Sequence, residues 1–192
     1  MQNTLPLLIL CGGLSSRMGS PKPLLPFGGT SLIAWLANQA QRPVWLASGG
    51  TIYPEARVCR YLPDALAGRQ GPLSAILPAL LLARQEGADG VYLMSCDTLI
   101  RPEDMCRLLT PGGAPPPFSV LAGAGRTHPL LGYWPARLAP PLQDYLDGGG
   151  RRVNHWIEGA GVQKIPMPEE WARLANFNTP EDFARAAAHM AN

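Results

Sequence analysis

Near the N-terminus the chain reads Leu7-Leu8-Ile9-Leu10-Cys11-Gly12-Gly13, a short apolar run that ends in two adjacent glycines. A run of this kind, closed by a turn signal, is typical of a buried strand. Because glycine has no Cβ atom, the turn allows backbone N–H groups to approach phosphate oxygens closely. Arg17 and Lys22 follow in the same loop, and both are cations that bind phosphate. The stretch therefore predicts a strand that leads into a loop binding a nucleoside triphosphate.

This loop differs from the two commonest phosphate-binding motifs. A P-loop reads G-x-x-x-x-G-K-[ST], whereas here Pro21 precedes Lys22 and Pro23 follows it. The dinucleotide fingerprint G-x-G-x-x-G is also absent, because Gly12 and Gly13 are adjacent. The alternative is a surface turn of small residues. Two cations directly behind a buried-looking strand favour phosphate binding over that alternative.

The composition predicts a globular protein with one core. A chain of 192 residues is long enough for one buried core and short for two, so we expect a single domain over residues 1–192. Hydrophobic residues make up 46% and charged residues 16%, which excludes wholesale disorder. The net charge is +2 and no basic stripe with interleaved aromatics is present, which argues against nucleic acid as a partner.

Cysteine usage and the N-terminus predict a reduced compartment. The four cysteines form no C-x-x-C pair and no zinc spacing with the three histidines. The N-terminus has no cationic leader, and its apolar stretch is too short to span a bilayer. We therefore expect a cytoplasmic protein that does not contact a membrane.

Short apolar runs alternate with stretches in which apolar residues recur at helical spacing. Five runs predict strands, at residues 7–10, 44–47, 58–62, 91–95 and 119–122. Residues 31–41 and 72–86 predict helices between the first four. This alternation is typical of an α/β fold with a mostly parallel sheet and helices on both faces, in which ligands bind beyond the carboxyl ends of the strands.

The last third of the chain is less regular. Strands are expected at residues 128–134 and 162–165, and helices at 138–147, 152–158 and 180–190. The final helix has the strongest start signal, because Thr179 is a good N-cap, Pro180 suits the first turn, and Glu181 and Asp182 are acidic.

A second group of candidate residues follows later strands. The run Tyr92-Leu93-Met94-Ser95-Cys96-Asp97 is a strand that leads into an aspartate, at the edge where the first loop opens. Mg²⁺ prefers carboxylate and phosphate oxygens, so Asp97 fits a magnesium ligand. The alternative is an aspartate that caps the next turn. Asp64 lies before Gly71 and Pro72, where a helix start would face an anion or a base; it is equally consistent with an ordinary turn.

These pieces together resemble the molybdenum cofactor guanylyltransferase family, whose Rossmann-like sheet is of the nucleotide-diphospho-sugar transferase type. The family signature L-x-G-G-x-x-x-R-M-G-x-x-K is matched by Leu10, Gly12, Gly13, Arg17, Met18, Gly19 and Lys22. Its later motifs D-x(6)-G-P-L and C-D-T are matched by Asp64, Gly71, Pro72, Leu73, Cys96, Asp97 and Thr98. The family's H-P, Y-L-x-x-G-x-R-x-V and N-x-N-T-P-E-D segments are similar to residues 128–129, 145–153 and 176–182. The resemblance thus covers nearly the whole chain.

The resemblance implies transfer of GMP from GTP to molybdopterin, or to its metal-bound form, with release of pyrophosphate. Because the attacking phosphate is already an anion, no general base is required. The implied catalytic residues are Arg17, Lys22 and Asp97, with Mg²⁺ as the cofactor on Asp97. The implied nucleotide contacts are Leu10, Cys11, Gly12, Gly13, Lys22, Asp64, Gly71 and Asp97. The implied pterin contacts are His128, Arg151, Arg152, Asn176 and Asn178.

For three of the implied pterin contacts, a purely structural role is an open alternative. His128 is also consistent with a histidine packed in the fold, and Arg151 and Arg152 are also consistent with solvated arginines at a helix start. The expected partners are GTP and molybdopterin, with transient contact to molybdoenzymes or cofactor-delivery proteins. Two positions depart from the family. Pro21 stands where an aspartate is frequent, and Ser48 stands near a position where an asparagine helps to hold the nucleoside.

Three other functions compete with this one. A molybdopterin cytidylyltransferase has the same chemistry but uses CTP, and Gly12, Asn176 and Asn178 favour guanine over it. A sugar-phosphate nucleotidyltransferase is usually longer than this chain. A non-catalytic, nucleotide-binding accessory protein for molybdoenzyme maturation would not need Lys22 and Asp97.

Overall fold

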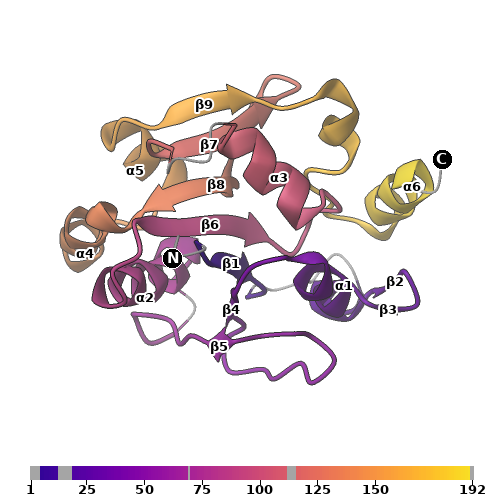
Figure 1. Ribbon diagram of the computed structural model, residues 1–192, viewed down its shortest axis with the longest axis horizontal. Coiled ribbons are helices and arrows are strands. Elements are labelled where there is room, and N and C mark those ends of the chain that lie inside the picture. Colours follow the sequence, from indigo (N-terminus) through magenta and orange to yellow (C-terminus); the bar gives the residue numbers. More distant parts are fainter. Residues whose placement is uncertain (1–4, 13–18, 69, 112–115, 191–192) are drawn as a thin grey trace.

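The computed structural model describes residues 5–12, 19–68, 70–111 and 116–190, so the loop positions Gly13 and Arg17 lie outside the described residues. Within these ranges a seven-stranded sheet forms the centre of the molecule (Figure 1). Its strands are β1 (Leu7–Leu10), β4 (Val44–Ala47), β5 (Arg60–Tyr61), β6 (Gly90–Ser95), β7 (Ser119–Gly123), β8 (Arg126–Pro135) and β9 (Gln163–Pro166). A separate hairpin pairs β2 (Pro26–Phe27) with β3 (Thr30–Ser31).

The strands lie in the order β5-β4-β1-β6-β8-β7-β9, and β8 runs antiparallel to both of its neighbours. The other pairs of this sheet are parallel, so the expected α/β fold with a mostly parallel sheet is confirmed. The reversal of β8 has a local cause. Ala124 and Gly125 alone connect β7 to β8, with φ of 51° and 70°, and a two-residue turn with positive φ joins antiparallel strands.

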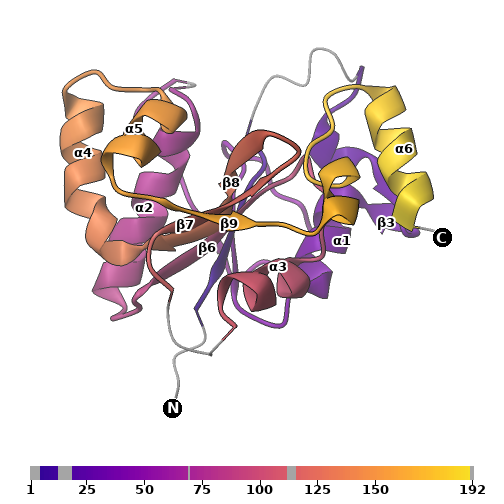
Figure 2. The ribbon, with the colours of Figure 1, turned by 90° about the horizontal axis from the view of Figure 1, so that it is seen from above.

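Helices cover both faces of the sheet, because the residues of β1 alternate between two apolar cores. Leu7 and Ile9 pack into one core, and Leu8 and Leu10 pack into the other. The first core is covered by α1 (Leu32–Gln39), α3 (Pro102–Leu109) and α6 (Pro180–Met190). The second is covered by α2 (Pro72–Gln85), α4 (Ala139–Asp147) and α5 (Val153–Gly159), as Figure 2 shows. None of the described helices is long and apolar enough to cross a membrane.

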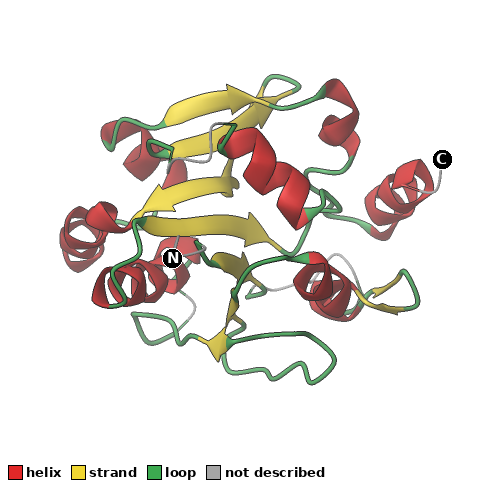
Figure 3. Cartoon of the chain, in the orientation of Figure 1, coloured by secondary structure: helices red, strands yellow, loops and turns green. Residues whose placement is uncertain are grey.

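Most of the expected elements are present with changed ends (Figure 3). The strand expected at 58–62 shortens to β5, although the amides of Cys59 and Leu62 still bond to β4 at 2.8 Å. The β2–β3 hairpin is an addition to the sequence prediction, and its turn consists of Gly28 and Gly29 with φ of 57° and 80°. The described residues also contain the short 3-10 helices η1 (Lys22–Leu24), η2 (Ala136–Leu138) and η3 (Glu169–Arg173).

The expected start of α6 is confirmed in detail. The amide of Asp182 donates to Oγ1 of Thr179 at 3.1 Å, and the amide of Thr179 donates to Oδ2 of Asp182 at 3.2 Å. These two bonds form a reciprocal cap that satisfies backbone N–H groups at the helix end. The cap fixes the direction in which the chain enters α6, and with it the position of the preceding asparagines.

Candidate functional site

Three parallel strands end together at one edge of the sheet. The register pairs Leu10 of β1 with Ala47 of β4 and with Ser95 of β6. The pairing extends by one residue, because the amide of Cys11 donates to Ala47 O at 2.8 Å and the amide of Cys96 donates to Leu10 O at 3.0 Å. Ligands in α/β sheets bind beyond the carboxyl ends of such strands. The loop after β1 and the segment after β6 therefore begin side by side.

Lys22 and Asp97 meet at this edge. Nζ of Lys22 lies 3.5 Å from Oδ2 of Asp97, and the two side chains are 15% and 25% exposed. Lys22 is the first residue of η1, and Asp97 lies two residues beyond the end of β6. The hydroxyl of Ser95 donates to the other carboxylate oxygen, Oδ1. A cation and a carboxylate that the sequence predicts from two separate motifs thus form one partly exposed charge pair.

The segment before α6 lies against the same pair. Nζ of Lys22 donates to the backbone oxygen of Phe177 at 2.7 Å and to Oδ1 of Asn178 at 3.1 Å. The ammonium group also lies 5.7 Å from the centre of the Phe177 ring, within the range of a cation–π contact. The amide of Phe177 donates to Asp97 O at 3.0 Å. Two segments far apart in the sequence, at Asp97 and at residues 177–178, therefore meet at Lys22.

The start of β8 brings His128 to this edge, because β8 runs opposite to β6 and pairs Leu131 with Met94. Burial of the half-buried imidazole lowers the pKa of His128, and the nearby Arg126 lowers it further. The Asp97 carboxylate acts in the opposite direction, which places His128 within the electrostatic reach of that group. A lowered pKa favours the neutral form of the imidazole near pH 7. A neutral imidazole can bind a ligand through hydrogen bonds.

Asp64, Gly71 and Arg151 form a second group at the start of α2. The guanidinium of Arg151 donates to Gln70 Oε1 at 3.0 Å and to two backbone oxygens of the 146–150 segment. Gly71 has φ of 87°, which favours glycine, and it leads directly into the helix. Burial raises the pKa of the Asp64 carboxyl. Within the described residues, neither Asp64 nor Arg151 makes a hydrogen bond or ion pair with Asp97.

The other expected residues have less defined surroundings. Gly12 is exposed, and a Cβ atom built on it meets no atom of the described residues within 4 Å. Arg152 is exposed at the start of α5, and Asn176 is partly buried and makes no hydrogen bond within the described ranges. The hydroxyl of Ser48 donates to Thr51 O at 2.6 Å, so it is bound within its own turn.

Two buried thiols lie beneath the site. Cys11 and Cys96 follow the paired ends of β1 and β6, and both side chains are buried. Burial raises the pKa of Cys11 well above its ordinary value, and Cys96 adds to this effect. A thiol in this environment stays protonated, so Cys11 fits a packing role and not that of a nucleophile.

The residues at the carboxyl edge of the sheet fit a magnesium ion whose ligands are mainly oxygens of the substrate. In the described part of the chain, no three His, Cys, Asp or Glu side chains are grouped to hold a metal ion. Mg²⁺ is usually bound by one or two carboxylates together with water and phosphate oxygens, and Asp97 can supply one carboxylate. Oδ2 of Asp97 already faces a positive charge at 3.5 Å. The ammonium charge opposes a second cation at Oδ2, so the donor set suits a divalent cation that arrives with nucleotide phosphates, which add negative charge and oxygen ligands.

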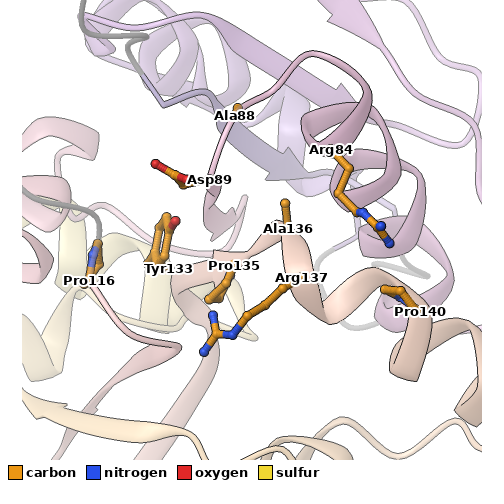
Figure 4. A pocket seen from close by; sticks show the side chains of 9 residues that line it. All are labelled: Arg84, Ala88, Asp89, Pro116, Tyr133, Pro135, Ala136, Arg137 and Pro140. Carbon is orange, nitrogen blue, oxygen red and sulfur yellow. The ribbon is translucent and has the colours of Figure 1, made fainter.

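Two hollows in the surface have the volume of ligand pockets. One, of about 750 Å³, lies between the β2–β3 hairpin and residues 51–55, which are segments that leave the carboxyl ends of β1 and β4. The other, of about 630 Å³, is lined by Asp89, Tyr133 and Arg137 among others (Figure 4). Because Asp89 precedes β6, this second hollow lies at the opposite edge of the sheet from Asp97. It contains none of the candidate residues.

The sequence analysis missed two contributors to the Lys22 environment. The backbone oxygen of Phe177 makes the shorter of the two hydrogen bonds from Lys22, and Ser95 binds Asp97. A backbone acceptor has no side-chain signature, so no sequence pattern identifies Phe177. Ser95 has a weak signal, because it is a polar residue at the end of an apolar run and precedes Asp97 by two residues.

Comparisons with known proteins agree with this architecture. Residues 7–161 match the family model described as the MobA-like NTP transferase domain. The chain is 35% identical over 182 residues to a molybdenum cofactor guanylyltransferase of Cereibacter sphaeroides, and the match covers 93% of each chain. The expected resemblance extends over the same range.

Two solved structures share the fold at lower identity. The molybdopterin-guanine dinucleotide biosynthesis protein A of Archaeoglobus fulgidus superposes with a TM-score of 0.68 and 21% identity, covering 97% of this chain and 99% of that one. A Mycobacterium tuberculosis protein solved in complex with manganese superposes with a TM-score of 0.55 and 17% identity, covering 96% and 98%. At these identities the likeness concerns the fold alone.

Proposed function

The chain belongs to the MobA-like NTP transferase family, and we propose that it transfers GMP from GTP to molybdopterin with release of pyrophosphate. The name of the 35% identical relative supports this substrate pair, because the match covers 93% of both chains. The observation that carries the proposal is the contact of Lys22 with Asp97 at the carboxyl edge of the sheet. Nucleotidyl transfer needs a fixed cation and a metal-binding carboxylate side by side, since charge neutralisation and alignment provide most of the catalysis.

Each residue at the edge has a proposed role on the nucleotide side. Lys22 would neutralise phosphate charge, together with Arg17 of the same loop. Asp97 would hold Mg²⁺, which offsets charge on the triphosphate when it is bound. The amide of Gly12 would donate to a phosphate oxygen, and Gly71 at the start of α2 would admit the nucleoside close to the backbone.

The molybdopterin side is proposed for residues at the margin of this edge. A neutral His128 suits a hydrogen bond to a pterin ring better than it suits charge neutralisation. Arg152 is exposed and available to a phosphate, whereas Arg151 is engaged by Gln70 and by backbone oxygens. We propose Arg152 as the freer of the two guanidinium groups to meet the second substrate.

We further propose that residues 1–192 act as one domain in the cytoplasm. The family model ends at residue 161, yet Phe177 and Asn178 supply acceptors to Lys22, which supports one functional unit. The four cysteines are free thiols, in keeping with a reducing compartment.

Pyrophosphate release tests the proposal. The purified protein is incubated with molybdopterin, Mg²⁺ and one of GTP, CTP or ATP, and pyrophosphate is measured against a reaction that lacks molybdopterin. We expect release with GTP that depends on molybdopterin and stops when a chelator is added. Equal release with CTP, or a preference for CTP, would contradict guanylyl transfer, and nucleotide binding without any release would favour a non-catalytic accessory protein.

A further inference from the structure

Within the described residues, three acceptors lie close to the ammonium group of Lys22. They are the backbone oxygen of Phe177 at 2.7 Å, Oδ1 of Asn178 at 3.1 Å and Oδ2 of Asp97 at 3.5 Å. Two of these acceptors are neutral and one is charged. The charged one is the longest contact, and it is also the proposed metal ligand. A cation on Asp97 would thus leave Lys22 with its two neutral acceptors.

The backbone that carries the two neutral acceptors is held in place by the fold. Phe177 is fully buried, its amide donates to Asp97 O at 3.0 Å, and its ring contacts the Phe183 ring at 5.0 Å. The amide of Asn178 donates to Oδ2 of Asp182 at 3.3 Å, inside the cap of α6. The backbone of residues 177–178 is therefore held on both sides, which fixes the Phe177 oxygen and the base of the Asn178 side chain, so that both can orient a flexible lysine before a nucleotide arrives.

We propose that Asn178 is a positioning residue for Lys22, and that it acts on the nucleotide through this lysine and not by contact with the pterin. The inference rests on the proposed phosphate role of Lys22. Its physical basis is that the amide oxygen accepts a hydrogen bond without cancelling the lysine charge. A carboxylate at the same place would keep the acceptor but would add a negative charge beside the phosphates. Asn178→Ala and Asn178→Asp therefore have different expected effects.

The first test measures the contact itself and needs no substrate. The chain has only two lysines, Lys22 and Lys164, and Lys164 is exposed on β9, so it serves as an internal reference. The rates at which acetic anhydride labels both lysines are followed by mass spectrometry. The ratio of Lys22 to Lys164 labelling should rise about threefold or more in Asn178→Ala, the size expected for loss of one hydrogen bond. It should fall below the parent ratio in Asn178→Asp, because a carboxylate favours the protonated, unreactive ammonium.

Asn154→Ala is the matched control for labelling. Asn154 is an exposed asparagine on α5 without a hydrogen bond in the described part of the chain, so the parent ratio is expected. Asn178 is itself exposed, and alanine keeps the amide that donates to Asp182, so Asn178→Ala should unfold at nearly the parent temperature. Parent labelling ratios in both Asn178 variants would overturn the inference.

The second test separates positioning from pterin contact. The affinity for Mg²⁺-GTP is measured by calorimetry in the parent, Asn178→Ala, Lys22→Ala and the double variant. Asn178→Ala should weaken binding about 5- to 20-fold, Asn178→Asp should weaken it more, and Asn178→Ala should add little once Lys22 is absent. The KM for molybdopterin should stay at the parent value in Asn178→Ala. Additive losses in the double variant, or an effect confined to the molybdopterin KM, would overturn the inference. A parent protein that binds no nucleotide but shows the expected labelling would overturn the proposed function and leave the contact supported.

Discussion

Replacing Lys22 by alanine should lower turnover far more than it lowers stability. The structure explains why the stability cost is small. The side chains of Lys22 and Asp97 are both partly exposed, and partly exposed ion pairs at 3.5 Å contribute at most about 1 kcal/mol to stability. The hydrogen bonds to Phe177 and Asn178 are part-buried and exposed, respectively, and together they add about 1 kcal/mol, since bonds open to water lie near the low end, about 0.5 kcal/mol, of the net range for a protein hydrogen bond.

The expected loss of stability is therefore about 1 to 2 kcal/mol in total, or a fall in Tm of about 2 to 8 °C for a chain of this size. The kinetic cost is larger, because the lysine would face charge that is transferred during the reaction. Removal of one preorganised cation or donor costs about 2 to 4 kcal/mol in the transition state, which is about 30- to 1,000-fold in kcat/KM. The two quantities differ enough to be separated experimentally.

The assay combines steady-state pyrophosphate release with urea denaturation of the same preparations. Lys164→Ala is the control, because Lys164 is the other lysine of the chain and is exposed on β9. This control should retain parent values in both measurements. Near-parent kcat/KM in a folded Lys22→Ala protein would refute the phosphate role of Lys22. A loss of activity that is fully explained by unfolding would refute it as well.

Three other outcomes are expected. Asp97→Asn should keep the fold but require much more Mg²⁺ for turnover, since an amide oxygen is neutral; a parent-like Mg²⁺ titration would exclude Asp97 as the metal ligand. GTP should be preferred over CTP by at least about tenfold in kcat/KM, or about 1.4 kcal/mol, and equal values would remove the guanine assignment. Although burial raises the pKa of Glu103, hydrogen bonds from Arg42 and Gln41 lower it overall, so its contribution to stability is present above its ordinary pKa and is lost as the pH falls. Denaturation across that acidic range should therefore show a smaller pH dependence for Glu103→Gln than for the parent, and an unchanged slope would contradict this linkage.

The parts of the fold that the sequence predicts well are those with one dominant local signal. The run at residues 7–10 is apolar at every position and matches β1, since a strand buried on both faces shows no alternation. The direction of β8 is not readable from its own residues. It depends on the two-residue connection at Ala124 and Gly125, whose φ values allow only a tight reversal.

The candidate site, like the fold, has features that the sequence predicts and features that it does not. The approach of Lys22 to Asp97 is predictable in outline, because two loops that leave the carboxyl ends of neighbouring parallel strands must start close together. The part played by Phe177 is not predictable, because its backbone oxygen reaches Lys22 only once the segment between β9 and α6 is placed against the residues that follow β6. A sequence motif identifies side chains and does not identify the backbone groups that hold them.

The position of these acceptors makes the C-terminal segment part of the site rather than an appendage to it. Residues 7–161 contain six of the seven strands of the sheet, Lys22 and Asp97, and they match the family model. Lys22 nevertheless depends for two of its hydrogen bonds on residues 177 and 178, and the amide of Leu99 donates to Leu174 O at 2.9 Å. Electrostatic catalysis is efficient when the charged groups are oriented before the substrate binds, because no reorganisation is then needed during the reaction. We propose that in this chain that orientation comes from the segment whose backbone contacts attach it to the residues following β6.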